Sequence, residues 1–220
     1  TYPLGNTVVT WTVVDASGNS ATCLQNVTVI DNQNPTITCA PDQTQNNDAG
    51  LCSANVTVTG PTFSDNCVGT TVTNDFNGTN DASGVYPVGT TTVIWTATDG
   101  SGNTSTCVHL ITVVDNEAPT MTCPLDQTQT ADAGLCSANV TVLGPTATAD
   151  NCAVATLIND FNGTNDASGV YPVGTTTVTW TLTDVNGNTS TCIQLITVTD
   201  DEDPIITCPA DINTPADFGL

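Results

Sequence analysis

The chain contains no lysine and no arginine among its 220 residues, whereas aspartate and glutamate together number 22, so its formal net charge is −22. Without basic side chains it has no groups to neutralise the phosphates of a nucleic acid, and we exclude nucleic acid as a partner. The same absence excludes a lysine Schiff base and an arginine clamp for phosphate. Water, salt or metal cations must offset the carboxylates, which leaves both a solvated and a cation-loaded surface open.

Histidine is almost as scarce, because His109 is the only one, and the repeats described below place Gln25 and Gln194 at its equivalent positions. A histidine that glutamine replaces is expected to be an edge or boundary residue rather than a catalyst. A glycosidase needs two carboxylates with distinct roles, and no pair stands out from the rest. No apolar run is long enough to span a membrane and no secretory signal is visible. We therefore expect neither enzymatic activity nor direct membrane insertion.

What the chain does contain is an internal repeat. The segment DNQNPTITCAPDQTQNNDAGLCSANVTVTGP begins at Asp31 and recurs with few changes from Asp115. Equivalent cysteines set the period, since 84 residues separate Cys23 from Cys107 and 85 separate Cys107 from Cys192. We expect whole repeats at 31–115 and 116–200, the C-terminal part of a preceding repeat at 1–30, and the N-terminal part of a following one at 201–220.

Each repeat reads as a series of short strands. Runs rich in valine, isoleucine and threonine are broken by asparagine, aspartate, glycine and proline, with no helical periodicity. In TTTVIWTATD, alternation puts Val93, Trp95 and Ala97 on one face, and the same pattern recurs in the other copies. About seven strands in some 85 residues, with one tryptophan each, predict an all-β chain of tandem immunoglobulin- or fibronectin-III-like β-sandwiches.

The order of motifs resembles the hyalin repeat (HYR) family: TCP, DAG-x-C, DNC, YPVGTTTV-x-W-T-x-TD, GN-x-x-TC and a final VxD followed by proline. The resemblance covers essentially the whole chain. It implies a fibronectin-III-like sandwich from an extracellular, cell-surface adhesion protein. Long arrays of this kind also look like giant bacterial surface adhesins, including the gliding-motility adhesins of the Bacteroidetes.

Ten cysteines at repeated spacings indicate an oxidising, extracellular compartment. Family members that resemble this chain but have two cysteines keep the positions of Cys39 and Cys107, and both should lie near one pole of a sandwich. The resemblance therefore implies these four intra-repeat pairs: Cys39–Cys107, Cys123–Cys192, Cys52–Cys67 and Cys136–Cys152. Cys23 and Cys208 are then without partners. Pairing between neighbouring repeats, such as Cys23 with Cys39, is the alternative.

Acidic linkers and acidic turns predict a calcium site at the joints between sandwiches. The linkers resemble the Asp/Asn-rich linkers of cadherins, and Ca²⁺ takes six to eight oxygen ligands. The alternatives are a solvated linker and a hairpin turn in which aspartate caps backbone amides. The candidate ligands, drawn from linkers, DNC triplets and turns, are Asp31, Asn32, Asp65, Asp99, Ser101, Asn103, Asp115, Asn116, Glu117, Asp150, Asp184, Asn186, Asn188, Asp200, Asp201 and Asp203.

Two functions fit these features. The first is a structural stalk or filament segment of a cell-surface adhesin, stiffened by disulfides and linker Ca²⁺, whose partners are adjacent repeats or other copies of the chain. The second is a multivalent module that binds surface glycans or proteins through the polar loop 74–84 and its copy from Asn159. A hydrolase would need a pocket that the sequence does not indicate.

Overall fold

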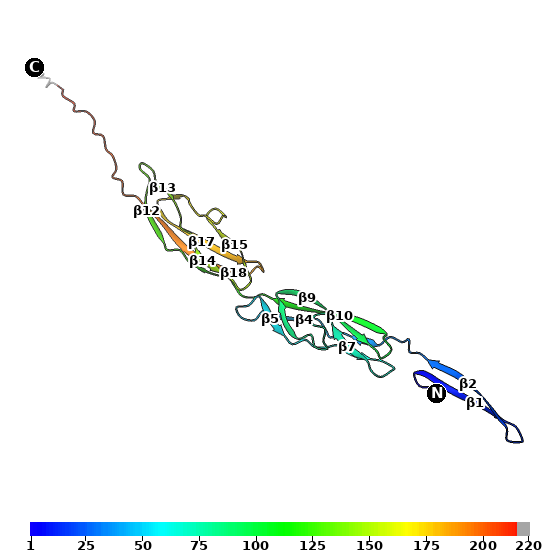
Figure 1. Ribbon diagram of the computed structural model, residues 1–220. Coiled ribbons are helices and arrows are strands. Elements are labelled where there is room, and N and C mark those ends of the chain that lie inside the picture. Colours follow the sequence, from blue (N-terminus) through cyan, green and yellow to red (C-terminus); the bar gives the residue numbers. More distant parts are fainter. Residues whose placement is uncertain (215–220) are drawn as a thin grey trace, which may run out of the picture. The chain divides into compact units, whose positions relative to one another are not determined.

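The computed structural model describes residues 1–214, and within them every regular element is a β-strand (Figure 1). The predicted all-β architecture is confirmed. The same residues include no helix that is both long and apolar enough to cross a membrane. The chain divides into two compact units, Thr1–Asn116 and Glu117–Leu220.

The first unit holds a hairpin and a whole sandwich of eight strands. One sheet has the order β4-β10-β9-β7, with β4 parallel to β10, and the ladders β3-β6 and β5-β8 form the opposite layer. The strands are β1 (Gly5–Val14), β2 (Ser20–Val29), β3 (Thr36–Thr38), β4 (Gln43–Asn46), β5 (Ser53–Val56), β6 (Thr62–Ser64), β7 (Thr71–Asn74), β8 (Gly84–Pro87), β9 (Gly89–Thr98) and β10 (Thr104–Val114).

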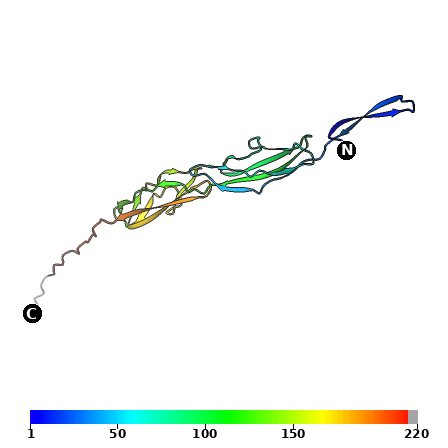
Figure 2. The same ribbon diagram turned by 90° about the horizontal axis from the view of Figure 1, so that it is seen from below.

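The second unit repeats this sandwich strand for strand. Its larger sheet has the order β12-β18-β17-β15, and its ladders are β11-β14 and β13-β16. In Figures 1 and 2 the long hairpins β9-β10 and β17-β18 run the length of their own sandwiches. The strands are β11 (Thr120–Thr122), β12 (Gln127–Thr130), β13 (Ser137–Val140), β14 (Thr146–Ala149), β15 (Val154–Asn159), β16 (Gly169–Pro172), β17 (Gly174–Asp184) and β18 (Thr189–Thr199).

The core lies between the two layers of each sandwich. The predicted inward face of β9 is confirmed, since Val93, Trp95 and Ala97 are fully buried while the intervening Ile94 is 40 % exposed. Trp180 occupies the matching position in β17 and is also fully buried. Alternation along a strand with one covered face explains both patterns.

The hairpin β1-β2 shows how far this apolar face is exposed to solvent when no second layer covers it. Its Trp11 corresponds to Trp95 in the sequence repeat, yet it is 59 % exposed, and Val13 beside it is 68 % exposed. Within residues 1–214 the hairpin pairs only with itself, in the two-stranded sheet β1-β2. Burial of the tryptophan therefore depends on the second layer and not on the hairpin alone.

Each whole sandwich has two distinct poles, which set the positions of its loops. The first, here called the leading pole, contains the β9-β10 turn at 99–103, whose Asn103 Nδ2 donates to the Asp31 carbonyl (3.3 Å). The second, the trailing pole, contains the β4-β5 loop, because Asn47 N donates to the Val114 carbonyl at the end of β10 (2.9 Å). The 11 residues of β10 separate the poles by roughly 35 Å.

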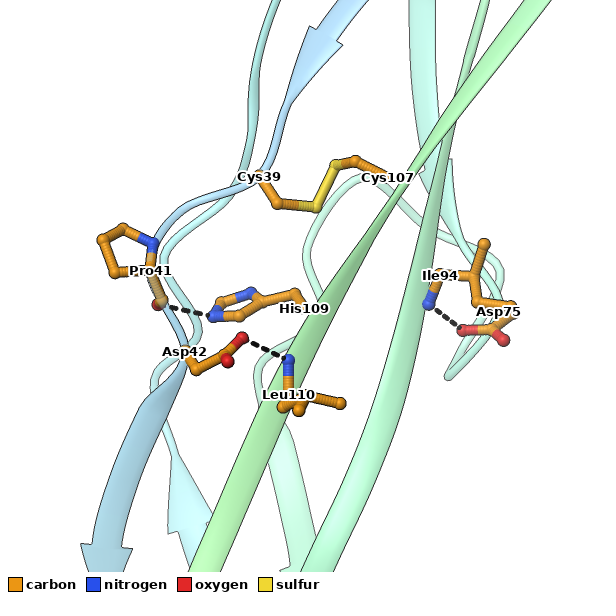
Figure 3. Close-up of a disulfide and its surroundings, with 8 residues drawn as sticks. All are labelled: Cys39, Pro41, Asp42, Asp75, Ile94, Cys107, His109 and Leu110. Carbon is orange, nitrogen blue, oxygen red and sulfur yellow. Dashed lines mark hydrogen bonds between the residues drawn. A yellow bond between two sulfur atoms is a disulfide. The ribbon is translucent and has the colours of Figure 1, made fainter.

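His109 belongs to the core, so its prediction as an edge or boundary residue is wrong. The side chain is fully buried, because β10 is a central strand between β4 and β9. Its Nε2 lies 3.0 Å from the Pro41 carbonyl (Figure 3). A carbonyl only accepts hydrogen bonds, so Nε2 carries the proton and the other ring nitrogen, Nδ1, has none when the ring is neutral.

The glutamine at the same position of the second repeat makes a more complete set of bonds. Trp180 Nε1 donates to Gln194 Oε1 (3.1 Å), and Gln194 Nε2 donates to the Leu125 carbonyl (2.9 Å). In the first repeat Trp95 Nε1 and His109 Nδ1 are both buried without a hydrogen-bond partner. A buried donor left unsatisfied costs about 1–3 kcal/mol.

We therefore expect His109→Gln to raise the unfolding free energy of the first repeat by about 1 kcal/mol, since the new amide satisfies both Trp95 and Pro41. Urea unfolding followed by tryptophan fluorescence measures the change. The reciprocal variant, Gln194→His, should destabilise the second repeat by a similar amount. An H109Q chain that is less stable than the parent would contradict this reading of the two cores.

Candidate metal centres and disulfides

Cys39 and Cys107 form a disulfide with an S–S distance of 1.99 Å and a Cα–Cα distance of 5.7 Å (Figure 3). Cys39 directly follows β3 in one layer, and Cys107 lies on β10 in the other, opposite Trp95. The bond therefore ties the two layers together beside the largest core residue. It closes a loop with a sequence separation of 68 residues.

The expected pairs Cys52–Cys67 and Cys136–Cys152 are not formed in this structure. Cys52 and Cys152 are each disulfide-bonded, whereas Cys67 and Cys136 are free thiols. The physical reason is the distance between the poles. Cys52 lies in the β4-β5 loop at the trailing pole, where Val88 N donates to its carbonyl, and Cys67 lies at the leading pole. A disulfide needs Cα atoms within about 7 Å, and no side-chain rotation spans a sandwich.

Cys123 and Cys192 occupy the positions of Cys39 and Cys107 in the second repeat, and both are free thiols. They are close neighbours. Burial raises the pKa of the Cys192 thiol to about 12, and the hydrogen bond with Cys123 and the charge of that group act in the same direction. The second repeat therefore brings together the same two sulfur atoms that are bonded in the first.

Carboxylates gather at the leading pole of the first repeat. Asp31, Asp65 and Cys67 each place one ligand atom within 4.8 Å of the others. Asp31 is the first linker residue, and Asp65 follows β6, so the sandwich brings together residues far apart in the sequence. Asp31 Oδ2 is buried and meets no N–H or O–H donor. A buried carboxylate oxygen without a donor is costly unless a cation compensates it.

Asp99 adds negative charge to this cluster, which we call the first acidic cluster. The pKa of the Cys67 thiol is raised chiefly by its hydrogen bond to the Asp31 carboxylate, and also by burial and by the charges of Asp65 and Asp99. Burial alone would raise the pKa of Asp99, but hydrogen bonds from Asn103 and from the Ser101 amide outweigh it and lower the pKa. Asp99 therefore stays ionised beside the other carboxylates.

The equivalent positions of the second repeat form the second acidic cluster. Asp115, Asp150 and Asp184 have carboxylate oxygens within 4.8 Å of one another. Asp150 Oδ1 is buried and receives no hydrogen bond, although Oδ2 of the same group accepts one from the Cys152 amide (2.9 Å). Hydrogen bonds from Asn188 and Asn186 lower the pKa of Asp184 against the opposing effect of burial. The linker, DNC-triplet and turn aspartates thus recur as a set.

The remaining candidate ligands lie outside these sets or use their polar atoms elsewhere. The Ser101 and Asn186 amides and the Asn103 and Asn188 side chains donate to Asp99 or Asp184, so these residues orient carboxylates. The Asn116 amide donates to Asn47 Oδ1. The acidic members that belong to neither cluster are Glu117, Asp200, Asp201 and Asp203, and the remaining linker candidates, Asn32 and Asn116, are amides.

Two contacts at these poles were not apparent from the sequence. Cys67 lies among the carboxylates of the first acidic cluster, and the sequence predicted only a disulfide for it. At the trailing pole of the second repeat, both carboxylate oxygens of Glu202 accept a hydrogen bond from the Gly134 amide (2.9 Å each). The sequence signal for this contact is the glycine of the DAG motif, because Gly134 adopts a positive φ (72°) that favours glycine.

The polar loop after β7 is held by its own side chains. Asn74 Nδ2 donates to Asn77 Oδ1 and to the Thr79 carbonyl, Asn77 Nδ2 donates to the Asp81 carbonyl, and Asp81 Oδ1 accepts from the Ser83 amide. Its Phe76 ring stacks on Tyr86 at 4.3 Å. The second repeat has the same bonds from Asn159. Most polar groups of the loop are therefore already used within it.

Comparison with known families decides where this chain belongs. The model of the HYR domain matches it twice, over residues 30–113 and 114–198. The chain belongs to the HYR domain family. The second match begins before Asp115, so all three residues of the second acidic cluster fall within one HYR domain.

Two similar proteins are hyalins. Hyalin of Lytechinus variegatus is 34 % identical over 99 % of this chain and 40 % of its own length, and hyalin of Strongylocentrotus purpuratus is 36 % identical over 99 % and 18 %. The HYR chain thus spans less than half of these relatives. They are animal proteins, so the expected resemblance to bacterial gliding-motility adhesins finds no support here. Relatedness to hyalin and the Cys39–Cys107 disulfide place the chain outside the cell.

Among solved structures, the chain is similar to mouse cadherin-23 EC22-24, with a TM-score of 0.39 and 14 % identity over 89 % of this chain and 74 % of that one. Protocadherin gamma B2 domains 1–5 give a TM-score of 0.40 and 11 % identity over 90 % and 47 %. Similarity of this degree carries no information about ligands or function.

Proposed function

We propose that these HYR repeats form a stalk or filament segment of an extracellular, cell-surface adhesion protein. In this proposal the repeats are spacers with no catalytic role, and their partners are adjacent repeats or further copies of the chain. The observation that carries it is the recurrence of one acidic set in both repeats, at the pole where each linker enters its sandwich. A repeat that serves as a spacer needs linkers whose bending can be restricted.

Calcium is the cofactor that suits these sets. Both clusters offer carboxylate oxygens, which hard cations such as Ca²⁺ prefer, and each holds a buried carboxylate oxygen that receives no hydrogen bond from an N–H or O–H group. No lysine or arginine is present to neutralise them. Asp31 and Asp115 belong to linkers, so a cation bound there would join a linker to its sandwich. We propose Asp31, Asp65 and Asp99 as the first ligand set and Asp115, Asp150 and Asp184 as the second.

Disulfides supply the second source of rigidity in this proposal. Cys123 and Cys192 match the bonded pair of the first repeat and are already neighbours. We propose that they too are bonded in the mature extracellular protein. Each sandwich would then have its two layers tied together beside its tryptophan.

The alternative, a glycan- or protein-binding module that uses the loop 74–84, has less support. A binding loop needs polar groups that face a ligand, and the amide side chains of this one bond mainly to the loop itself. The aromatic side chain of the loop, Phe76, is 37 % exposed, but its ring is held against the structure by stacking on Tyr86. We therefore treat the loop as a structural element.

Calcium binding is tested by melting the 220-residue chain with EDTA or with Ca²⁺. Binding to the folded state alone adds about 2.7 kcal/mol when the free ion is at about 100 times its Kd. We expect the melting temperature to rise by several degrees with Ca²⁺ and to fall again with EDTA. Small-angle scattering of the same samples should show a more extended particle with the ion, because linker flexing is reduced.

Matched variants decide whether the clusters are responsible. Asp65→Asn and Asp150→Asn each remove one charge from a cluster and should together abolish the Ca²⁺ response. Asp211→Asn removes the same charge from an exposed residue outside both clusters and should leave the response intact. If D65N/D150N responds to Ca²⁺ as the parent does, the metal proposal fails. The acidic linkers would then be solvated only.

A further inference from the structure

The last strand of the first repeat is paired along only part of its outer edge. Strand β10 pairs with β9 along Thr104–Val113, whereas β4 lies on its other side only from Ile111 to Val114. Within residues 1–214, no strand pairs with the β4 side of β10 before Ile111. The segment Thr104–Val108, which we call the open edge, therefore has a paired strand on one side only.

The backbone groups of the open edge that point outward can be assigned from the next residues of β10. The Leu110 amide donates to Asp42 Oδ1 (2.9 Å), in the segment that leads into β4, so Leu110 faces away from β9 (Figure 3). In an antiparallel ladder, successive residues alternate the side to which their N–H and C=O groups point. Thr104, Thr106 and Val108 therefore direct both groups away from β9, as Leu110 does.

The open edge lacks the features that usually prevent a strand from pairing with another chain. Such edges are commonly blocked by lysine, proline, a β-bulge or a charged side chain. The chain has no lysine, and the open edge contains neither proline nor a carboxylate. The β9-β10 register runs through it without a shift. Its outward side chains are exposed, that of Val108 by 56 %, so a further strand has access to it.

A second copy of the chain suits this edge in both charge and shape. The formal net charge of −22 makes two copies repel one another wherever their carboxylates meet. An edge without charged side chains is where that repulsion is weakest. In an antiparallel pair centred on Thr106, threonine lies opposite threonine and Thr104 lies opposite Val108. Pairs of β-branched residues such as these pack well across neighbouring strands.

We propose that the open edge of β10 pairs in antiparallel fashion with the same edge of a second copy of the chain. Each outward residue then exchanges both of its backbone hydrogen bonds with the residue opposite it, and the contact closes as a two-fold pair. The second repeat has an equivalent edge at Thr189–Ile193 of β18, since the Leu195 amide donates to Asp126 Oδ1 (2.8 Å) and β12 pairs only from Ile196. This pairing presupposes the proposed function, in which further copies of the chain are partners.

Sedimentation velocity over a series of protein concentrations tests the pairing, with the free thiols of the 220-residue chain alkylated so that no disulfide joins two copies. We expect reversible self-association that strengthens as NaCl is raised, because salt screens the repulsion between carboxylates. Thr106→Asp combined with Thr191→Asp places like charges opposite each other and should raise the dissociation constant about fivefold or more. The matched control, Thr92→Asp with Thr177→Asp, makes the same charge change on exposed threonines of β9 and β17 and should leave the constant unchanged.

Hydrogen exchange of the parent chain provides a second measurement that needs no variant. The Thr106 and Val108 amides should become protected when copies associate, whereas the Cys107 amide faces β9 and is protected in the monomer. A parent that stays monomeric at every concentration and salt, an equal effect of T92D/T177D, or unprotected Thr106 and Val108 amides in the associated chain would each overturn the pairing. If such a chain still melts higher with Ca²⁺, only the pairing is rejected and the proposed stalk function stands.

Discussion

Replacing Trp95 with alanine is expected to lower the unfolding free energy of the first repeat by about 3–5 kcal/mol. Its side chain is fully buried between the layers, opposite Cys107 in the ladder and among valines and alanines too small to fill the space. The loss combines the transfer of a large aromatic group with the cavity that remains. Since small domains have only about 5–15 kcal/mol of stability, the variant is close to the limit of folding.

The chain supplies its own control for this substitution. Trp11 has the same place in the sequence repeat but is 59 % exposed, so Trp11→Ala should change stability by less than about 0.5 kcal/mol. Urea unfolding followed by circular dichroism compares the two. Equal effects of W95A and W11A would mean that the second layer does not create the core around Trp95.

Removing the Cys39–Cys107 disulfide is expected to destabilise the first repeat by about 4 kcal/mol. The bond closes a loop with a sequence separation of 68 residues. In the chain-entropy model, a bond that closes a loop of this length stabilises the fold by about 4 kcal/mol, because it reduces the number of conformations open to the unfolded chain. We expect Cys39→Ser to unfold at a correspondingly lower denaturant concentration. Its folded state should keep the same strands, because β3 retains its pairing with β6.

Two controls separate this effect from the loss of a cysteine as such. Cys23 and Cys208 are exposed free thiols, so Cys23→Ser and Cys208→Ser should leave the transition unchanged. Reduction of the parent chain should lower the transition at least as far as C39S does, because reduction also opens the disulfide bonds of Cys52 and Cys152. If the reduced parent and C39S are as stable as the oxidised parent, the loop-closure account of this bond would be falsified.

The strands and the core could be predicted because their pattern is local. Alternating residues such as Val93, Trp95 and Ala97 need only one covered face to become the core, and their recurrence at a fixed period revealed two copies of the same sandwich. The gathering of Asp31, Asp65 and Asp99 at one pole also followed from the positions of turns along the strands. Linkers and hairpin turns come at the ends of strands in any sandwich.

The features that the sequence did not predict are those that depend on contacts between different strands. The spacing of Cys52 and Cys67 suggests a small local loop, but the strands β5 and β6 carry the chain from one pole to the other between them. His109 was misjudged because nothing in its sequence shows that β10 has a strand on each side. The glutamine at this position in the other copies suggested that many residue types fit there. Instead, the position holds a buried side chain that can form hydrogen bonds, as Gln194 does with Trp180.

The Cys39–Cys107 bond also sets how far a repeat can lengthen under tension. Force that reaches residue 39 passes to residue 107 through the sulfur atoms, so the segment between them, with its separation of 68 residues, cannot be drawn out while this bond holds. An extended chain of that length spans roughly 230 Å. A repeat that has been unfolded by force is therefore shorter than the fully extended chain by about that distance, until a reductant cleaves the disulfide.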